Sequence, residues 1–242
     1  MSKIGTTIKR KLRRYCYCVV LAAGDSKRMG EDKLDMTICG KTVLQLCLEN
    51  LSASDYIDEI VVVTREDKVE HVAALCGEMG LKKVKKVVIG GKTRTESALA
   101  GVSETSKKAK VICIHDGARP FVTEDVITDA VQKAVAYKAA APAVKVKDTL
   151  KETEKGVVTS TPDRENLYAV QTPQAFDADV IKLALTSAVG SGLTYTDDCA
   201  AVEALGISVR LSRGSESNIK ITTPVDIVLG EAIFKSMEEK EE

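Results

Sequence analysis

The sequence predicts an α/β protein whose single Rossmann-like domain is built on a doubly wound, mostly parallel sheet with a protruding β-hairpin arm. Apolar stretches of strand length, rich in β-branched residues, alternate with stretches whose apolar residues recur at helical spacing. That alternation is typical of repeated strand and helix units, and 242 residues commonly form one such domain. After residue 144 polar and apolar residues alternate on both sides of Lys155 and Gly156, as in two antiparallel strands joined by a turn.

Each expected element follows from its own residues. The first strand is indicated by the apolar run CYCVVLA, and four more such runs are expected to lie parallel to it. A proline in the first turn favours the last helix. The expected strands are 16–22, 59–64, 86–89, 111–115, 139–144 and 209–212, and the expected helices are 43–51, 69–76, 95–102, 124–137 and 224–237.

Charge and cysteine content exclude several classes of function. The 35 lysines and arginines equal the 35 aspartates and glutamates, which argues against a nucleic-acid or membrane partner. No apolar run approaches the roughly 20 residues of a membrane span. The seven cysteines are scattered without metal-ligand spacing, as in a reduced, cytoplasmic protein. Basic residues crowd positions 1–14, which we expect to be a solvated tail before a domain at 15–238 with its arm at 145–165.

A turn of small residues ends the first expected strand, in the stretch LAAGDSKRM at 21–29. Open α/β sheets bind ligands at the carboxyl ends of their strands, and Ala22, Ala23 and Gly24 let backbone N–H groups approach phosphate oxygens. Arg28 and Lys33 can supply positive charge. The chain has neither the GxGxxG of dinucleotide sites nor a P-loop. The turn is a candidate polyphosphate site, although a tight strand-to-helix connection would have the same sequence.

A pair of glycines follows a later strand, in GGKTRTES at 90–97. Gly90 and Gly91 leave backbone groups able to read the edge of a pyrimidine, because no side chain intrudes. Arg94 and Ser97 open the next helix. The alternative is an ordinary turn whose threonine caps that helix.

The block HDGARPF at 115–121 places a carboxylate, Asp116, at the tip of an apolar strand, followed by Arg119. A buried carboxylate is costly without a partner, so this position indicates a function. His115, by contrast, is expected to hydrogen-bond within the core.

Together these motifs resemble the sugar-phosphate nucleotidyltransferases, and among them the 2-C-methyl-D-erythritol 4-phosphate cytidylyltransferases. The likeness spans about residues 19–227 and includes KDTLK at 147–151, TPDRENLY at 161–168 and QTPQAF at 171–176. It implies that 15–238 is a nucleotidyltransferase domain. With Mg²⁺, that domain would join CTP to 2-C-methyl-D-erythritol 4-phosphate, a polyol phosphate, in isoprenoid precursor synthesis.

The resemblance also implies a role for each motif. Arg28 and Lys33 would be catalytic, stabilising charge on the α-phosphate, and Asp116 would bind Mg²⁺. The arm would cross to a second subunit, so that the enzyme is a homodimer. The residues implied to bind CTP are Ala22, Ala23, Gly24, Asp25, Gly90, Gly91, Arg94 and Ser97, and those implied to position the polyol phosphate are Arg119, Thr149, Arg164 and Lys220. Asp197 and Asp198, in TDDCAAVE, are expected to cap a helix and brace basic residues.

Departures from the family pattern leave alternatives open. Ser26, Asp32 and Leu34 change the first loop, so that Lys27 or Lys41 could compete with Lys33 for the phosphate. Lys92 stands where some relatives carry an acid. A ribitol 5-phosphate cytidylyltransferase is the nearest alternative function, and a non-catalytic nucleotide-binding module is the alternative from another class.

Overall fold

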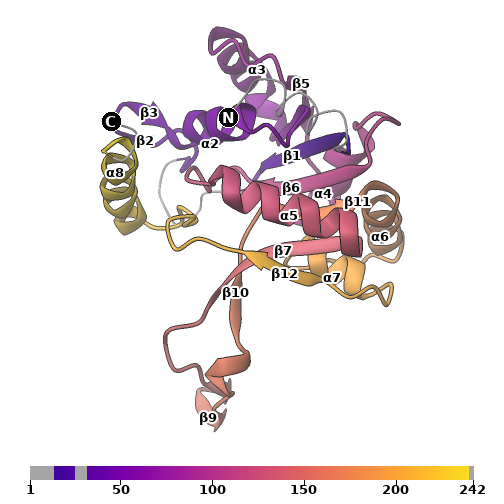
Figure 1. Cartoon of the computed structure of the whole chain (residues 1–242), viewed down its shortest axis with the longest axis vertical. Helices are drawn as coiled ribbons and strands as arrows, with labels where there is room; N and C mark the ends of the chain where they lie inside the picture. The colour runs from indigo at the N-terminus through magenta and orange to yellow at the C-terminus, as the bar shows by residue number, and fades with distance from the viewer. Residues whose placement is uncertain (1–13, 25–31, 240–242) are drawn as a thin grey trace, which may run out of the picture.

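The computed structural model describes residues 14–24 and 32–239. Its centre is an eight-stranded sheet in the order β10-β7-β11-β6-β1-β4-β5, with β12 paired to β7 (Figure 1). The strands β4, β1 and β6 run parallel to one another, and β12 runs parallel to β7, whereas β11 and β10 are antiparallel to their neighbours. The strands are β1 (Cys16–Ala22), β4 (Glu59–Thr64), β5 (Val84–Ile89), β6 (Val111–Asp116), β7 (Ala139–Lys145), β10 (Tyr168–Val170), β11 (Gln174–Asp177) and β12 (Arg210–Arg213).

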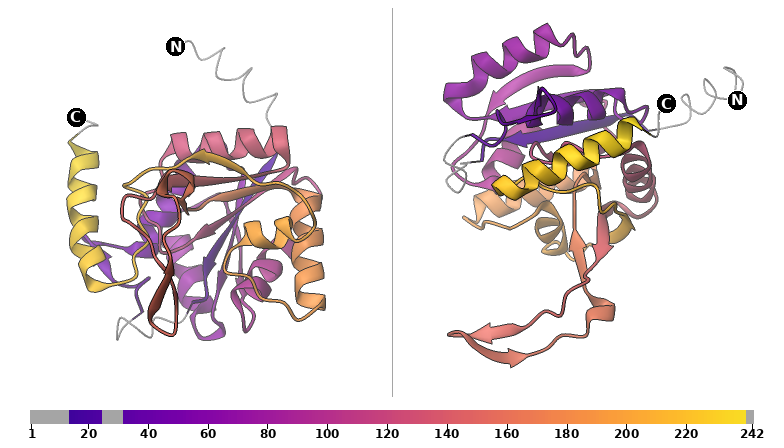
Figure 2. Two further views of the ribbon diagram at one scale, coloured as in Figure 1. Left: turned by 90° about the horizontal axis from the view of Figure 1, so that it is seen from below. Right: turned by 90° about the vertical axis from the view of Figure 1, so that its left-hand side faces the viewer.

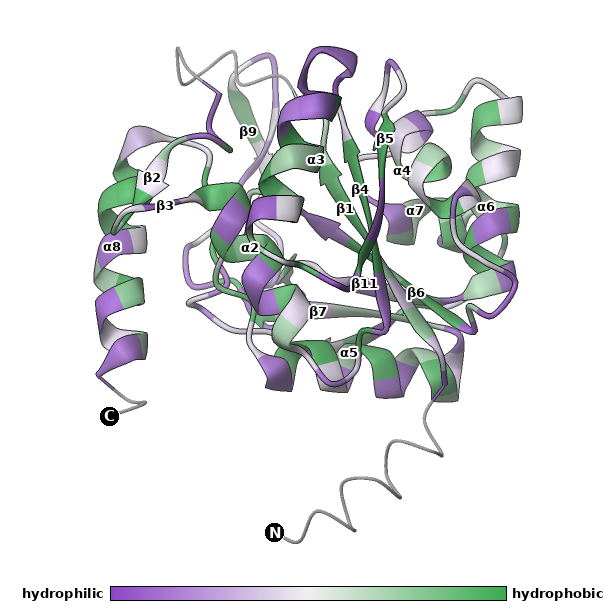
Figure 3. Cartoon of the chain, turned by 90° about the horizontal axis from the view of Figure 1, so that it is seen from above, coloured by the Kyte–Doolittle hydropathy of each residue, from purple (hydrophilic) through white to green (hydrophobic). Residues whose placement is uncertain are grey.

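Helices cover both faces of this sheet. Successive residues of a strand point to opposite faces, so Cys18 and Val20 of β1 pack in one core while Tyr17 and Val19 pack in the other. In Figure 3 the central strands are mainly hydrophobic, and the surrounding helices carry bands of hydrophilic residues. The first core includes α2 (Val43–Ala53), α3 (Val69–Glu78) and α5 (Glu124–Tyr137), and the second includes α4 (Arg94–Ser103), α6 (Ala178–Gly190) and α7 (Asp198–Glu203).

The helices begin where side chains satisfy their first backbone N–H groups. Thr42 and Gln45 form a capping box at α2, and Asp177 accepts from two backbone N–H groups of α6. The last helix, α8 (Pro224–Glu238), has its proline in the first turn. It lies along the side of the body beside the short strands β2 (Thr37–Ile38) and β3 (Lys41–Thr42) (Figures 1 and 2). No helix in 14–24 or 32–239 is long and apolar enough to cross a bilayer.

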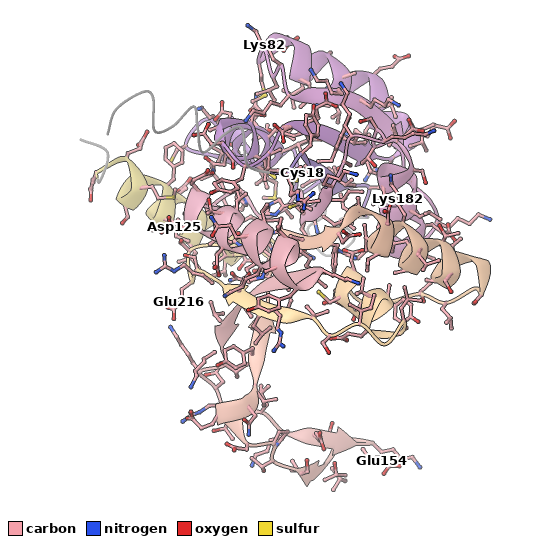
Figure 4. The ribbon with its side chains drawn as sticks, turned by 45° about the vertical axis from the view of Figure 1, so that its right-hand side comes forward. Cys18, Lys82, Asp125, Glu154, Lys182 and Glu216 are labelled. Carbon is pink, nitrogen blue, oxygen red and sulfur yellow. The ribbon has the colours of Figure 1, made fainter. Side chains whose placement is uncertain are left out.

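The arm leaves the body between β7 and β10 and extends well away from it (Figure 2). Its strands β8 (Glu152–Glu154) and β9 (Val157–Ser160) are antiparallel, and both turn residues, Lys155 and Gly156, have positive φ, at 51° and 82°. That geometry matches the twist of a two-residue hairpin. Figure 4 shows Glu154 at the far end of the arm and Cys18 within the body. Every residue of β8 and β9 is exposed.

The α/β fold with a mostly parallel sheet and a hairpin arm is confirmed, but the sheet is not a simple succession of parallel strands. The strand β11 lies between β6 and β7 and is antiparallel to both. Neither β11 nor the helix α6 was expected from the sequence. β11 has only four residues, directly after Pro173, which is too short for a hydrophobic period to be recognised. The two strands that the sequence places in succession are therefore separated by a later segment.

Candidate active site

A cavity of about 460 Å³ opens at the carboxyl ends of β1, β5 and β6. This edge is where open α/β sheets bind ligands. Several residues singled out in the sequence line it together, although they come from distant parts of the chain. They are Ala22, Ala23, Gly24, Lys33, Gly91, Arg94, Ser97, Asp116 and Lys220.

One wall of the cavity follows β1. Ala22 is the last residue of the strand, and beyond its chain neighbours no atom of the described residues lies within 4 Å of the place where a Cβ of Gly24 would stand. Lys33 lines the cavity, whereas Lys41, which was considered as an alternative, pairs with Glu49 at 2.8 Å on the surface. Four residues of this loop named above, Asp25, Ser26, Lys27 and Arg28, lie outside the described part of the chain.

The opposite wall is the turn between β5 and α4. A Cβ at Gly90 would stand 2.8 Å from both Ala23 Cβ and Ser97 Oγ, so a side chain there does not fit without movement. The backbone N–H of Gly91 donates to Ser97 Oγ at 3.1 Å, and that hydroxyl donates to Thr93 O at 2.9 Å. Thr93 also caps α4. The helix cap and the glycine turn therefore coexist, and the turn brings bare backbone to the cavity.

Asp116, at the end of β6, is surrounded by three cationic side chains. Its Oδ2 lies 2.8 Å from Lys220 Nζ and 3.7 Å from Arg119 Nε, and its Oδ1 lies 3.6 Å from Arg94 Nη2. Burial alone would raise the pKa of Asp116, but the charges of Lys220, Arg94 and Arg119 outweigh it and hold this pKa well below its usual range. The carboxylate is ionised at neutral pH, and the group around it keeps a net positive charge.

Arg94 is fixed from behind by a second carboxylate. Its Nη2 lies 2.8 Å from Oδ2 of Asp198, a residue that is 1% exposed at the start of α7. Burial lowers the pKa of Arg94, but the charges of Asp198 and Asp116 outweigh burial and raise it. Asp197 caps α7 by accepting from the N–H of Ala200 at 3.0 Å. The expectation that these aspartates cap a helix and brace a basic residue is confirmed.

His115 is fully buried, as expected of a residue that hydrogen-bonds within the core. Its ring nitrogens contact Thr172 Oγ1 at 3.0 Å and the carbonyl oxygen of Arg119 at 3.1 Å. Burial lowers the pKa of His115 to about 4. The ring is therefore neutral at physiological pH.

The two arm residues lie apart from this cavity. Thr149 and Arg164 are exposed, and Arg164 Nη1 donates to the carbonyl oxygen of Lys147 at 2.9 Å, within the arm itself. Within one chain the arm residues do not join the residues around Asp116. The structure thus brings together most of the residues named for the body of the protein but leaves Thr149 and Arg164 on the arm, outside the cavity.

The sequence reasoning missed one cation of the cavity, Arg65. It follows β4 directly, and its Nη2 lies 3.1 Å from Asp32 Oδ2 while its Nε donates to Asp67 Oδ1 at 3.2 Å. A basic residue directly after a buried strand, at the ligand-binding edge, was the available signal. Lys92, noted above as a departure, also lines the cavity, and its backbone N–H donates to Glu96 Oε2 at 2.6 Å.

A doubly wound sheet that gathers a glycine turn, a cationic cluster and a carboxylate around one cavity defines a nucleotide-binding enzyme of the nucleotidyltransferase class. The sequence model of the 2-C-methyl-D-erythritol 4-phosphate cytidylyltransferase family matches residues 16–236. The chain belongs to this family.

Individual relatives agree along nearly their whole length. The chain is 42% identical over 222 residues to the 2-C-methyl-D-erythritol 4-phosphate cytidylyltransferase of Clostridium botulinum strain ATCC 19397, covering 90% of this chain and 97% of that protein. It is 42% identical over 227 residues to the same enzyme of Halalkalibacterium halodurans, covering 93% and 99%. The crystal structure of 4-diphosphocytidyl-2C-methyl-D-erythritol synthase from Anaerococcus prevotii superposes with a TM-score of 0.82 at 30% identity, covering 92% of this chain and 96% of that one.

Proposed function

We propose that this enzyme transfers the cytidylyl group of CTP to 2-C-methyl-D-erythritol 4-phosphate, giving 4-diphosphocytidyl-2-C-methyl-D-erythritol and pyrophosphate for isoprenoid synthesis. The observation that carries the proposal is the cationic cluster of Lys220, Arg94 and Arg119 around Asp116, beside a cavity that Lys220, Arg94, Asp116 and the glycine turn line. A site for two phosphorylated substrates needs that excess of positive charge.

The chemistry requires positioning more than acid–base groups. A substrate phosphate oxygen attacks the α-phosphorus of CTP, a new P–O bond forms, and the bond from this phosphorus to the bridging oxygen breaks. Pyrophosphate leaves with that electron pair. Because the attacking phosphate is already ionised, the protein has to align it and offset the charge that develops. Lys33 lies in the cavity for that purpose, and Arg28, outside the described residues, is proposed to act with it.

The base is proposed to be read by the turn at Gly90 and Gly91. A Cβ at Gly90 would meet Ala23 Cβ and Ser97 Oγ, so the turn has no room for a side chain there, and Gly91 lines the cavity without one. Such a wall discriminates by shape, because a purine is larger than the pyrimidine that it admits. Ala22, Ala23 and Gly24 approach the triphosphate from the other side.

Mg²⁺ is proposed as the metal, and the residues present fit it. Mg²⁺ commonly binds one or two carboxylates together with substrate phosphates, whereas an all-protein cage needs more ligands. Asp116 is an ionised carboxylate at the cavity, and within 14–24 and 32–239 no group of three or more metal-ligating side chains is assembled. Asp116 would hold the ion against the nucleotide phosphates. The bound ion would supply charge neutralisation there.

The arm at 145–165 is proposed to complete the site of a second subunit in a homodimer. Thr149 and Arg164 are exposed and do not line the cavity of their own chain, and the arm exposes apolar side chains such as Val157, which is 68% exposed. A projecting hairpin of this kind is a surface for association. In the proposed assembly, these two residues position the polyol phosphate of the partner together with its Lys220 and Arg119.

Residues 15–238, including the arm, are proposed to be one nucleotidyltransferase domain preceded by a basic tail. A cytoplasmic location is proposed because none of the seven cysteines, all within the described residues, forms a disulfide and six of them are buried, as in proteins of a reducing compartment. With charges balanced at 35 each, no nucleic-acid or membrane partner is proposed.

A pyrophosphate-release assay tests the function. CTP with 2-C-methyl-D-erythritol 4-phosphate should release pyrophosphate, whereas ribitol 5-phosphate, or ATP, GTP or UTP in place of CTP, should give little. The ribitol alternative is not favoured, because the relatives at 42% identity act on the methylerythritol substrate. CTP binding by calorimetry without pyrophosphate release from either polyol phosphate would leave only the non-catalytic module.

A further inference from the structure

We infer that His115 and Thr172 are positioning residues for Asp116 and Arg119, acting through hydrogen bonds behind the cavity. The inference deepens the proposed function, on which it rests for the roles of the two residues that are positioned. His115 and Thr172 are 0% and 4% exposed, and neither lines the cavity. They therefore act through other residues.

The directions of the hydrogen bonds follow from which atoms can only donate or only accept. The carbonyl oxygen of Arg119 only accepts, so Nε2 of His115, at 3.1 Å, carries the ring proton. The backbone N–H of Asp116 donates to Thr172 Oγ1 at 3.1 Å. The hydroxyl of Thr172 in turn donates to Nδ1 of His115 at 3.0 Å, because a neutral ring leaves that nitrogen as an acceptor.

These hydrogen bonds form one connected chain of bonds that links the two ends of the turn after β6. It runs from the N–H of Asp116 through Thr172 and His115 to the carbonyl oxygen of Arg119. The turn has its own bond from the N–H of Arg119 to the carbonyl oxygen of Asp116 at 3.0 Å. Both ends of the turn are thus tied to one histidine on the strand that carries it. A shift of either end breaks a bond in the chain.

A second branch fixes the guanidinium of Arg119 to the same threonine. The carbonyl oxygen of Thr172 accepts from Asn218 Nδ2 at 2.9 Å, and the carbonyl oxygen of Asn218 accepts from Arg119 Nη1 at 2.7 Å. Thr172 therefore holds the backbone of Arg119 through His115 and its side chain through Asn218. The segment that carries Asn218 also carries Lys220, which pairs with Asp116.

The arrangement matters because Arg119 is held in place although one of its N–H donors makes no hydrogen bond among the described residues. Its Nε is buried, has no hydrogen-bond partner among the described residues, and lies 3.7 Å from Asp116 Oδ2. Because Nε does not hydrogen-bond Asp116, the position of Arg119 depends on the bonds to Asn218 and His115. Displacements of about 1 Å in such groups cost turnover far more than they cost folding.

Four variants test the inference. His115→Gln keeps a donor near the position of Nε2 and loses the acceptor at Nδ1, and Thr172→Val removes the hydroxyl at nearly constant volume, while Thr172→Ser keeps it. Cys113→Ala is the matched control, because Cys113 is also fully buried, two residues earlier on β6, and has no role in the site. Turnover, the KM of each substrate and the melting temperature are measured for each.

We expect His115→Gln and Thr172→Val each to lower kcat about tenfold, with melting temperatures no lower than that of Cys113→Ala, while Thr172→Ser keeps at least about half of the wild-type kcat. The double variant His115→Gln/Thr172→Val should be about as slow as the slower single variant, because both changes break the same series of hydrogen bonds. If Thr172→Val does not fold, His115→Gln and Thr172→Ser still decide. A kcat within about twofold of wild type in His115→Gln, or single effects that multiply in the double variant, overturns the inference.

Failure of the proposed function is distinguished by the wild-type enzyme. If wild type releases no pyrophosphate from either polyol phosphate, the proposed function fails, and the crystal structure of His115→Gln then decides the inference alone. Displacement of the turn from Asp116 to Arg119 supports the inference. A turn that keeps its wild-type position overturns it.

Discussion

Lys220 Nζ lies 2.8 Å from Oδ2 of Asp116, in the lining of the cavity at the carboxyl ends of β1 and β6. The lysine reaches Asp116 from the loop between β12 and α8, and its side chain is still 40% exposed. Lys220 is therefore paired on one side and open to a ligand on the other. From that position the Lys220 ammonium group can contact an incoming phosphate while it stays close to Asp116, so little further loss of hydration is needed.

Lys220→Gln should raise the KM of the polyol phosphate about tenfold and lower kcat by about a hundredfold, because the phosphate loses both charge and orientation. The pyrophosphate-release assay measures both constants. Lys41→Gln is the control, since Lys41 pairs with Glu49 on the surface and does not line the cavity. Equal constants for Lys220→Gln and Lys41→Gln would remove Lys220 from the substrate site.

Asp116→Asn should lower the free energy of unfolding by about 2 kcal/mol at neutral pH, because Lys220 and Arg119 lose their counterion, while Arg94 keeps its pair with Asp198. The pKa of Asp116 is lower in the folded protein than in the unfolded chain. Its contribution is therefore complete above the unfolded value of about 3.9 and is lost as the pH falls through the lower, folded value.

Urea unfolding of wild type and Asp116→Asn at several pH values checks this sign. The difference between the two proteins should be constant between about pH 5 and 8 and should shrink below about pH 4. A difference that instead grows on acidification would show that the carboxylate is not held ionised by its neighbours.

Gly90→Ala should raise the KM of CTP at least about tenfold, because the added methyl group stands 2.8 Å from Ala23 Cβ and Ser97 Oγ and must displace the turn. Gly77→Ala is the matched control. Gly77 lies within α3, and apart from its own helix no atom of the described residues lies within 4 Å of the added Cβ. Gly77→Ala should raise the free energy of unfolding by up to about 1 kcal/mol. A normal KM for CTP in Gly90→Ala would exclude this turn from the nucleotide site.

Mixed dimers test whether the arm acts on the partner subunit. Lys33→Ala and Arg164→Ala should each be nearly inactive alone. If Arg164 serves the partner's cavity, mixing the two proteins equally should recover about a quarter of wild-type turnover per site, since half of the dimers are mixed and each holds one intact site.

The control for this experiment is a mixture of two Lys33→Ala preparations, which cannot form an intact site. If the activity of the mixture does not rise above that of the separate variants, in dimers shown to have exchanged subunits, Arg164 serves its own chain. Subunit exchange is verified by mass spectrometry of one labelled partner.

The local pattern of apolar and polar residues predicted most of the strands and helices but few of the contacts between distant residues. The apolar runs gave the strand 16–22 and the helix 124–137 with the bounds that the structure has, because period and burial are set by neighbouring residues. The motifs also pointed to several residues that line the cavity, among them Arg94 and Asp116, since the ends of parallel strands must meet at one edge, whereas Gly90 and Arg119 lie outside its lining. β11 was not predicted because its four residues are too few to show a hydrophobic period.

The contacts that organise the site were beyond reach of one sequence. Arg94 and Asp198 are 104 residues apart, and Thr172 and His115 are 57 apart. Nothing in a local pattern selects such pairs, because their partners are chosen by how the sheet and its crossing loops pack. Arg65 was visible only as a charge after a strand, and its bridge to Asp32 emerges from tertiary structure.

The place of β11 affects how the protein is made. β6, the strand that ends in Asp116, pairs with β1 on one side and with β11 on the other. As a nascent chain leaves the ribosome, β6 and β1 emerge first, and β6 keeps an unpaired edge until Gln174–Asp177 have been synthesised. An unpaired hydrophobic strand is a template for intermolecular pairing. A chain whose synthesis stops before residue 174 would therefore leave this edge of the strand that ends in Asp116 open to intermolecular pairing.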